Sequence, residues 1–408
     1  MRICMFSRLT PDHRAYAPPV HGLLGQVFRD LGHDVTMLST ALPDGISTNS
    51  QADYATVHFL PGTTPGKQDS AFWRASAQAF DAMHSKRPFD VVFGRGAATW
   101  GFHKFSSASG RLPVIAHEGT YPLWLHQLQR QLPDQAAVLS KPLALLSYPF
   151  NRIYRTCLQR SNVAVCNSPA LAEALRQICW WSPPNTEFIP YGFNLEPWLA
   201  ASGQPSLSET PRIVFVGRLT ADKGALDLVE ILSRLPQRNV VVEAIGPVSD
   251  KIAHKLEVLA REKGVSARFL TPGPERNENL PLRLRGATAF LFPSTHPEGL
   301  SKSVMEAMAA ALPVVAYRIP GMDTLVRDGE TGWLVQPGDT AAAADRLDKL
   351  LCNPIMAAHI GLAASRRLAD HFTPADASAS WATLLTTVEA RHQFGKTAGA
   401  GVNSLRNR

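Results

Sequence analysis

Short apolar runs alternate with longer amphipathic segments along the first half of the chain. The runs are apolar on both faces, which is typical of strands in a parallel sheet that helices cover on both sides. Gly32 marks a turn between a helix and a strand, and Ser168-Pro169 predicts the start of a helix after the last strand. The predicted strands of this half span residues 2–7, 34–40, 89–96, 112–117 and 162–166.

The pattern breaks between residues 186 and 211, which are rich in Pro, Gly and Ser and predict a linker. Beyond this linker the alternation of apolar and amphipathic segments begins again. Residues 375–394 then predict a terminal helix, followed by a Gly-rich, basic tail. The second set of strands is predicted at 212–219, 239–247, 267–273, 287–294 and 313–317, with helices at 222–235, 251–264 and 303–311.

Two units of similar size joined by a linker predict an α/β protein with two Rossmann-like, doubly wound parallel-sheet domains facing a central cleft. We expect the terminal helix to pack back on the first domain and the tail to be disordered. The expected segments are 1–195 for the N-terminal domain, 196–211 for the linker, 212–375 for the C-terminal domain, 376–395 for the helix and 396–408 for the tail.

Ligands of such sheets bind beyond the carboxyl ends of the strands, so candidate chemistry is sought in the residues that follow strands. One such loop carries Gly217, Arg218 and Lys223. Its two cations could clamp a diphosphate, Arg through its planar fork and Lys as a point charge. The alternative is that both are solvated surface charges.

Two glutamates flank the start of a predicted buried helix in the second domain. Ser303 and Glu306 spell a capping box, which explains Glu306 without a ligand. Glu298 lies ahead of the helix on a loop expected to face the cleft, so capping does not explain it. Amides near Ser301 and Lys302 would favour a phosphate, and the two carboxylates could accept hydrogen bonds from sugar hydroxyls. Lys302 itself is either a phosphate contact or a plain surface lysine.

His117 ends a strand of the first domain, which predicts that it faces the cleft; a satisfied structural histidine is the alternative. Gly22, beside His21 in the predicted first helix, would let a ligand approach the backbone closely, or belongs to an ordinary helix start. The stretch FGRGAAT nearly matches GxGxxG but follows the wrong strand, so it is a weak dinucleotide signal.

Composition narrows the partners without choosing among them. A net charge of +7 over 408 residues favours anionic partners, but the charge is not concentrated enough to predict nucleic-acid binding. The five cysteines are scattered without a CxxC pair, which argues against a disulfide framework or structural zinc and fits a reducing cytoplasm. The N-terminus turns polar too early for a signal peptide and no apolar run spans a membrane, so any membrane contact is expected to be peripheral.

Three stretches resemble the family 4 glycosyltransferases of the GT-B fold: FVGRLTADKG, PSTHPEGLSKSVMEAMAAALPVVAY and RDGETGWLVQPGD. The resemblance covers nearly the whole chain and is more specific in the second half. It implies retaining transfer, of hexosyltransferase type, of a sugar from a nucleotide diphosphate sugar to an acceptor hydroxyl. The C-terminal domain would bind the donor, with a UDP- or GDP-linked sugar expected as co-substrate, and the N-terminal domain would lie on the acceptor side.

The same resemblance implies roles for single residues. Arg218 and Lys223 would neutralise the donor diphosphate, Glu298 would contact the donor sugar, and Glu306 would hold the ribose hydroxyls. His117 would lie near the reacting centre, so the implied catalytic group is His117, Glu298, Arg218 and Lys223. The implied donor-binding residues are Gly22, Gly217, Arg218, Lys223, Gly246, Leu270, Pro272, Glu298, Gly299, Leu300, Ser301, Lys302 and Glu306.

The sequence departs from the pattern of that family at a few places. His21-Gly22 stands where two glycines are common, and the linker stretch IPYGFN replaces the usual Pro-Asn-Gly-Val-Asp. Residues 301–303 replace a common Gly-Leu-Pro run, which matters little because amide donors do not depend on side chains. Asp323 stands where the family commonly has Glu. None of these changes removes a proposed catalytic group.

The chemistry can be stated from charge alone. Departure of a nucleoside diphosphate builds negative charge on the β-phosphate, which Arg218, Lys223 and the helix end would stabilise. No enzyme nucleophile is evident, so we predict that the acceptor attacks the face vacated by the leaving group, whose phosphate takes the acceptor proton. No DxD-type acidic cluster lies in a suitable loop, so we expect no required metal or other cofactor.

Residues 121–160 mix aromatic residues with Lys141, Arg152, Arg155 and Arg160. This segment could lie on an anionic membrane or receive a lipid-linked acceptor; the alternative is a core-facing helix with a solvated basic side. The expected partners are a nucleotide sugar and a glycan or lipid-linked acceptor, in polysaccharide, lipopolysaccharide or glycolipid assembly. The expected location is the cytoplasm, on the inner face of the membrane if that contact is made.

Three rival functions fit parts of the same pattern. A sugar-nucleotide epimerase or hydrolase would use the same donor pocket, and product analysis with and without acceptor separates it from a transferase. A non-catalytic sugar-nucleotide-binding protein would be favoured by loss of Glu298, Arg218 or Lys223, and all three are present. A nicotinamide dehydrogenase is disfavoured, because no proper GxGxxG follows the first strand.

Overall fold

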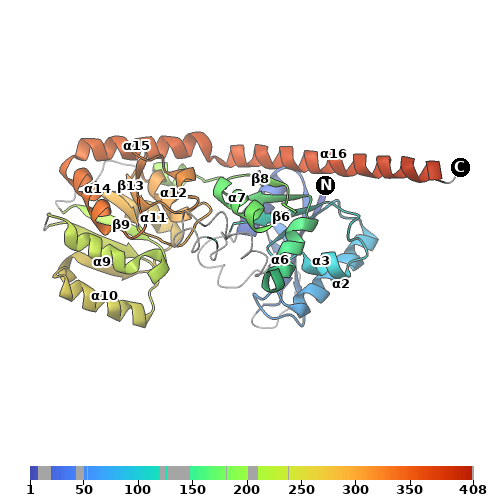
Figure 1. Ribbon diagram of the computed structural model, residues 1–408, viewed down its shortest axis with the longest axis horizontal. Helices are drawn as coiled ribbons and strands as arrows, with labels where there is room; N and C mark the ends of the chain where they lie inside the picture. Colours follow the sequence, from blue (N-terminus) through green and yellow to red (C-terminus); the bar gives the residue numbers. More distant parts are fainter. Residues whose placement is uncertain are drawn as a thin grey trace.

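The chain folds into two lobes, each built around one β-sheet with helices packed against it (Figure 1). Each sheet consists of parallel strands, apart from one antiparallel edge strand in the first lobe, so the predicted pair of Rossmann-like units is confirmed. The computed structural model describes residues 1–7, 20–42, 50–52, 54–119, 125, 148–180, 182–200, 210–237 and 239–406.

The first lobe contains eight strands in the order β3-β4-β2-β1-β5-β6-β7-β8. Three of them, β3, β4 and β8, were not expected from the apolar pattern, which gave only the five longer apolar runs. The antiparallel pairing of β3 with β4 was not expected either. The elements are β1 Arg2–Phe6, α1 Val20–Asp30, β2 Asp34–Thr40, β3 Ser50–Ala52, β4 Ala55–Leu60, α2 Ser70–Lys86, β5 Val91–Arg95, α3 Trp100–Phe105, β6 Val114–Glu118, α6 Tyr148–Arg160, β7 Val163–Cys166, α7 Pro169–Ile178 and β8 Thr186–Phe188.

The second lobe contains six parallel strands in the order β11-β10-β9-β12-β13-β14. The short helix α8, Glu196–Ala200, precedes this sheet inside the predicted linker. The elements are β9 Arg212–Val216, η2 Ala221–Lys223, α9 Ala225–Arg234, β10 Val241–Ile245, α10 Asp250–Glu262, η3 Ser266–Arg268, β11 Phe269–Gly273, η4 Asn277–Asn279, α11 Leu280–Leu284, β12 Ala289–Phe292, α12 Lys302–Ala309, β13 Val314–Tyr317, α13 Met322–Leu325, β14 Gly332–Val335, α14 Thr340–Cys352, α15 Pro354–His371 and α16 Pro374–Arg406.

Local signals in the sequence set several of these boundaries. Gly32 has a φ of +80°, a left-handed conformation that suits glycine, and it turns the chain from α1 into β2. The Ser168 hydroxyl accepts a hydrogen bond from the Leu171 amide at 3.2 Å, and Pro169 occupies the first turn of α7. The predicted start of this helix is therefore confirmed.

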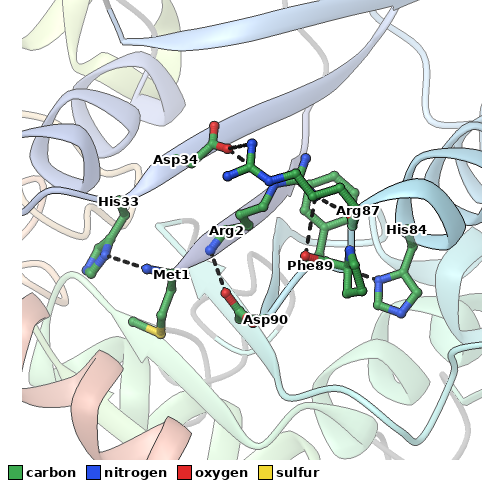
Figure 2. A network of polar contacts seen from close by, with 9 residues as sticks. Met1, Arg2, His33, Asp34, His84, Arg87, Phe89 and Asp90 are labelled. Carbon is green, nitrogen blue, oxygen red and sulfur yellow. Dashed lines mark hydrogen bonds and ion pairs between the residues drawn. The ribbon is translucent and has the colours of Figure 1, made fainter.

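A polar network joins the amino ends of the central strands of the first sheet (Figure 2). The Arg2 amide donates to Asp90 at 2.7 Å, and the Arg2 guanidinium pairs with Asp34 at 3.2 Å and lies 4.4 Å from the Phe89 ring centroid. Arg87 also pairs with Asp34, at 3.0 Å. Because these contacts lie at the amino edge of the parallel sheet, they fix the strands and leave the carboxyl edge to carry the candidate site.

Helix α16 starts beside the second lobe and runs along the first lobe (Figure 1). Trp381 is buried, with its ring centroid 5.2 Å from that of Phe28 and 5.9 Å from that of Phe93, in the same apolar cluster as Leu385. The backbone of α16 is helical as far as Arg406, through residues that the Gly-rich composition had led us to expect as a disordered tail. The division of the chain into domains remains a proposal.

The chain passes from one lobe to the other at two places, which lie side by side. The first passage follows β8, and the second joins α15 to α16. The Phe193 amide donates to the Phe372 carbonyl at 2.8 Å. A Cβ atom added to Gly192 would overlap the backbone of Pro374, so the two passages are in direct backbone contact.

Candidate active site

The loop after β9 packs closely against the end of β10. The Gly217 amide donates to the Ile245 carbonyl at 3.0 Å. Gly246 has a φ of +152°, and a Cβ atom at this position would overlap the Gly217 carbonyl oxygen. Only glycine permits this approach, so Gly217 and Gly246, both predicted site residues, form one backbone surface at the carboxyl edge of the second sheet.

This loop is also joined to the loop after β12. The Thr295 and His296 amides each donate to the Asp222 carbonyl at 2.9 Å. Gly224 is left-handed, with a φ of +74°, and a Cβ atom there would overlap the Pro293 carbonyl. Backbone contacts therefore hold the two loops together, independently of their side chains.

Lys223 and Glu298, which lie on these two loops, form an ion pair. Their side chains retain 14% and 19% of their accessible surface, so the pair is largely shielded but still reaches the surface. The Glu298 amide donates to the Pro320 carbonyl at 3.2 Å, and a Cβ atom at left-handed Gly321 would overlap the Glu298 carbonyl. The carboxylate is thus held on a fixed backbone.

His296 and Asp222 form a second pair between the same two loops, with 3.3 Å between Nδ1 and the carboxylate oxygen. Burial lowers the pKa of His296, and the neighbouring Lys223 lowers it further, while Glu298 and Asp222 oppose this shift. Arg218 is exposed on the same loop and also acts on His296 electrostatically. Both cations of the loop after β9, Arg218 and Lys223, therefore lie near His296.

Glu306 lies inside α12, two residues beyond the third helical position, where the glutamate of a capping box would stand. The helix starts at Lys302 with Ser301 as its N-cap residue, so the interpretation of Ser303 and Glu306 as a capping box is wrong. Glu306 is 5% exposed and pairs with Lys302 at 3.5 Å. Burial raises the pKa of Glu306, and Lys302 opposes this effect. Lys302 is therefore an exposed lysine paired with Glu306, and a contact between Lys302 and a phosphate stays a prediction.

The start of α12 lies directly after the loop that carries Glu298. Within the described residues Ser301 makes no side-chain hydrogen bond to the helix amides; its hydroxyl lies 3.3 Å from that of Ser303. Leu300 is buried, and it fixes this loop against the core of the second lobe. The amino end of the buried helix α12 therefore comes directly after the loop of Glu298, as the sequence predicted.

Leu270 and Pro272 lie on β11, the edge strand of the second sheet, with exposed side chains. The Gly246 amide donates to the Gly273 carbonyl at 2.9 Å. The edge strand is therefore joined directly to Gly246, and the predicted residues of β9, β10, β11 and the β12–α12 segment are brought to one edge of the sheet.

In the first lobe, His117 is fully buried rather than open to a cleft. Its ring centroid lies 5.9 Å from those of Phe93 and Tyr191 and 6.3 Å from that of Trp381. The prediction that the His117 ring faces a cleft is therefore wrong. Trp381, which lies on α16 and is distant in sequence, covers the end of β6 where His117 lies. A role for His117 near the reacting centre remains a prediction.

Asn167 joins the two lobes and was missed by the sequence analysis. A Cβ atom added to Gly299 would overlap the Asn167 amide group, and Asn167 Nδ2 donates to the Tyr191 hydroxyl at 3.2 Å. A Cβ atom at Gly119 would lie 2.9 Å from that hydroxyl. Asn167 directly follows β7, so its place at a strand's carboxyl end was the signal that could have identified it.

Glu118, next to His117, is a second residue that the sequence analysis did not single out. Its carboxylate is buried and accepts a hydrogen bond from the Gly96 amide at 3.0 Å. Burial raises the pKa of Glu118 to about 7, against the lowering effects of Arg95, Gly96 and Tyr154. Glu118 directly precedes Gly119, which packs against Tyr191 and Asn167 near the contact between the lobes.

The structure describes only part of two regions that the sequence analysis singled out, the surroundings of Gly22 and the basic segment 121–160. Gly22 lies in the first turn of α1, but its surroundings and residues 8–19 lie outside the described part of the chain. Of the basic segment 121–160, only Leu125 and α6 are described. In the described ranges, no group of three or more His, Cys, Asp or Glu side chains could hold a metal ion, and no helix is long and apolar enough to cross a membrane.

Comparison with known proteins agrees with this geometry. Two family models match consecutive parts of the chain: Glycosyltransferase Family 4 at residues 23–197 and Glycosyl transferases group 1 at residues 202–367. Two lobes, each built on a parallel sheet covered by helices, form the architecture of the GT-B class. The chain belongs to the family 4 glycosyltransferases of the GT-B fold.

Curated relatives include the α-maltose-1-phosphate synthase of Mycolicibacterium smegmatis, 26% identical over 67% of this chain and 74% of its own length. The D-inositol 3-phosphate glycosyltransferase of Corynebacterium efficiens is 39% identical over 34% of each chain, so the chain matches only about a third of that relative.

Solved structures show the same fold. Sucrose-phosphate synthase from Thermosynechococcus elongatus has a TM-score of 0.75 at 20% identity, covering 96% of this chain and 99% of its own. Anabaena HepE in complex with UDP-glucose has a TM-score of 0.67 at 16% identity, covering 95% and 100%.

Proposed function

We propose that this protein is a retaining glycosyltransferase, of hexosyltransferase type, that uses a nucleotide diphosphate sugar. The observation that carries the proposal is the Lys223–Glu298 ion pair, which two backbone-joined loops hold beside the start of α12. In the absence of donor the carboxylate balances the lysine. When a donor binds, its diphosphate takes over Lys223 as the counter-ion, and Glu298 becomes available to the sugar hydroxyls.

Charge development in the reaction fits this arrangement. As the nucleoside diphosphate leaves, negative charge grows on its β-phosphate, where Arg218, Lys223 and the amides at the start of α12 stabilise it. The acceptor hydroxyl attacks the same face of the sugar, and the leaving phosphate accepts its proton. Glu306 holds the ribose hydroxyls from within α12, while Leu270 and Pro272 on the edge strand lie beside the base. No metal ion is required in this scheme.

Uracil is the base favoured by similarity, because Anabaena HepE has been solved with UDP and with UDP-glucose. The curated relatives carry names of sugar-phosphate and inositol glycosyltransfer. We propose an acceptor in polysaccharide, lipopolysaccharide or glycolipid assembly, with the enzyme in the cytoplasm and in peripheral contact with the inner membrane face. GDP-linked donors remain the alternative.

Calorimetric titration with UDP tests the clamp. Lys223→Ala is expected to weaken UDP binding at least tenfold, because it removes a cation that faces the diphosphate. Arg218→Ala should do the same, while Lys251→Ala, an exposed lysine of α10, should change it less than twofold. Normal UDP and GDP binding by both loop variants would exclude the clamp.

A product assay then separates transfer from its rivals. Incubation with a radiolabelled UDP-sugar and an acceptor mixture should give a labelled glycan with unchanged anomeric configuration. An epimerised sugar nucleotide, or free sugar formed at an equal rate without acceptor, would favour the epimerase or hydrolase. A donor that binds tightly but stays intact with every acceptor would favour a non-catalytic binding protein.

A further inference from the structure

A basic hollow of about 560 Å³ lies between α3 and α6 on the first lobe. Figure 1 shows these two helices next to each other, away from the second lobe, which carries the donor loops. The hollow is a separate feature, since none of its residues belongs to the candidate site described above. Its lining residues are Trp100, His103, Lys104, Arg152, Ile153 and Arg160.

Among the residues that the structure describes, the lining has three cations and no carboxylate. Lys104 and Arg152 are exposed, and among the described residues neither forms an ion pair. The Arg160 guanidinium donates to the His103 carbonyl at 3.1 Å, which holds it at the wall of the hollow. Three like charges that line one hollow repel one another, so an anion in the hollow would lower their energy.

The buried side chain of His103 distinguishes this hollow from an ordinary basic surface. The residue is 6% exposed, and its Nε2 atom is buried without a hydrogen-bond partner in the described part of the chain. Burial, and then Arg160, lower the pKa of His103 to about 4, so the ring is neutral at pH 7. A buried ring nitrogen without a hydrogen-bond partner is unfavourable, and an anion oxygen that accepts a hydrogen bond from its N–H would remove that cost.

Aromatic side chains complete the site. The Lys104 ammonium lies 5.7 Å from the Trp100 ring centroid and 5.2 Å from that of Phe105, so the two rings restrain its position. Ile153 and Trp100 add apolar surface to the wall. Cations beside apolar and aromatic faces suit a phosphate that carries an organic group rather than a simple inorganic ion.

We propose that the α3–α6 hollow binds the phosphate group of a phosphate ester, with Lys104, Arg152 and Arg160 supplying charge and His103 donating a hydrogen bond. The ester is either a lipid headgroup or a soluble molecule, and both present the same chemistry. The site acts independently of the donor loops.

The test compares three variants in a Lys223→Ala background, which removes a phosphate-binding cation of the second lobe. Lys104→Ala/Arg152→Ala removes exposed charge, and His103→Phe keeps a ring but removes its nitrogens. Lys251→Ala/Lys255→Ala removes the same charge from exposed positions on α10. One arm measures sedimentation with phosphatidylcholine vesicles with or without phosphatidylglycerol, and the other measures sn-glycerol 3-phosphate binding by ³¹P line broadening.

We expect the first two variants to lose at least tenfold in affinity in one arm, and the α10 control to lose less than twofold. Loss in the vesicle arm assigns a lipid headgroup, and loss with sn-glycerol 3-phosphate alone assigns a soluble ester. Equal binding by all three variants in both arms overturns the proposal. Equal losses in the Lys104/Arg152 and α10 variants, with His103→Phe unaffected, indicate diffuse charge attraction and also overturn it.

Discussion

Glu118 shows how one buried side chain can make the protein sensitive to pH. Its pKa rises from 4.5 to about 7, so between these values the folded protein keeps a proton that the unfolded chain has lost. The folded state is therefore favoured most below pH 4.5, loses stability as the pH rises toward 7, and changes little above it. The whole span corresponds to about 3 kcal/mol in the free energy of unfolding.

Glu118→Gln should remove that pH dependence, because an amide cannot ionise. Urea unfolding between pH 4.5 and 8 is expected to show a decline for the wild type that the variant lacks. Glu187→Gln, an exposed glutamate on the neighbouring part of the sheet, is the control and should keep the wild-type decline. The same decline in Glu118→Gln would mean that other groups carry it.

For single residues, the sequence was sufficient to identify candidate side chains but not to predict how deeply each one is buried. Lys223 and Glu298 were predicted from their place after strands, and the structure pairs them. Ser303 and Glu306 fitted a capping box by spacing alone, yet the helix starts two residues earlier than that box requires. His117 was placed at the correct strand end, but its cover by Trp381 depends on a contact across most of the chain.

At the scale of elements, backbone contacts between loops fix the position of the candidate donor-binding residues. Gly246 links β9, β10 and β11, since its amide bonds Gly273 and its Cα faces the Gly217 carbonyl. A side chain at this position would push the loop of Arg218 and Lys223 away from the edge strand. Loop position, and not only loop sequence, should therefore determine donor binding.

Gly246→Ala should lower the free energy of unfolding by about 2 kcal/mol and weaken UDP binding more than tenfold. Both effects follow from strain combined with backbone overlap. Gly264→Ala separates the two causes, because Gly264 is also left-handed, at +67°, but nothing lies within 4 Å of an added Cβ atom. This control should lose about 1 kcal/mol and bind UDP normally; equal UDP affinity in the two variants would contradict the explanation.

Apolar periodicity was sufficient to predict the central strands and the helices that cover them. It missed β4, a strand near the edge whose burial alternates, and β14, which has only Gly332–Val335. Such short or half-buried strands are defined by their neighbours in the sheet rather than by their own sequence. For the same reason the contact between Asn167 of the first lobe and Gly299 of the second could not be predicted from the sequence of either lobe.

At the scale of the whole molecule, α16 contributes to the core of the lobe farthest from it in sequence. Trp381→Ala should destabilise the first lobe by about 3–5 kcal/mol, because the ring is buried against Phe28, Phe93 and His117. Amide hydrogen exchange should increase in β1, β5 and β6 and remain unchanged in β9 and β10. Leu362→Ala, at an exposed position of α15, is the control; faster exchange in both lobes would contradict a local effect.

The paired passages between the lobes restrict how the molecule can move. A single connecting segment would allow one lobe to rotate in any direction relative to the other. Two connecting segments in contact at Gly192 and Pro374 instead favour one motion, which is rotation about the line through both segments. Sliding would break the hydrogen bond between Phe193 and Phe372. Opening for exchange of substrates is therefore expected to follow a single hinge axis and to break the contact between Asn167 and Gly299.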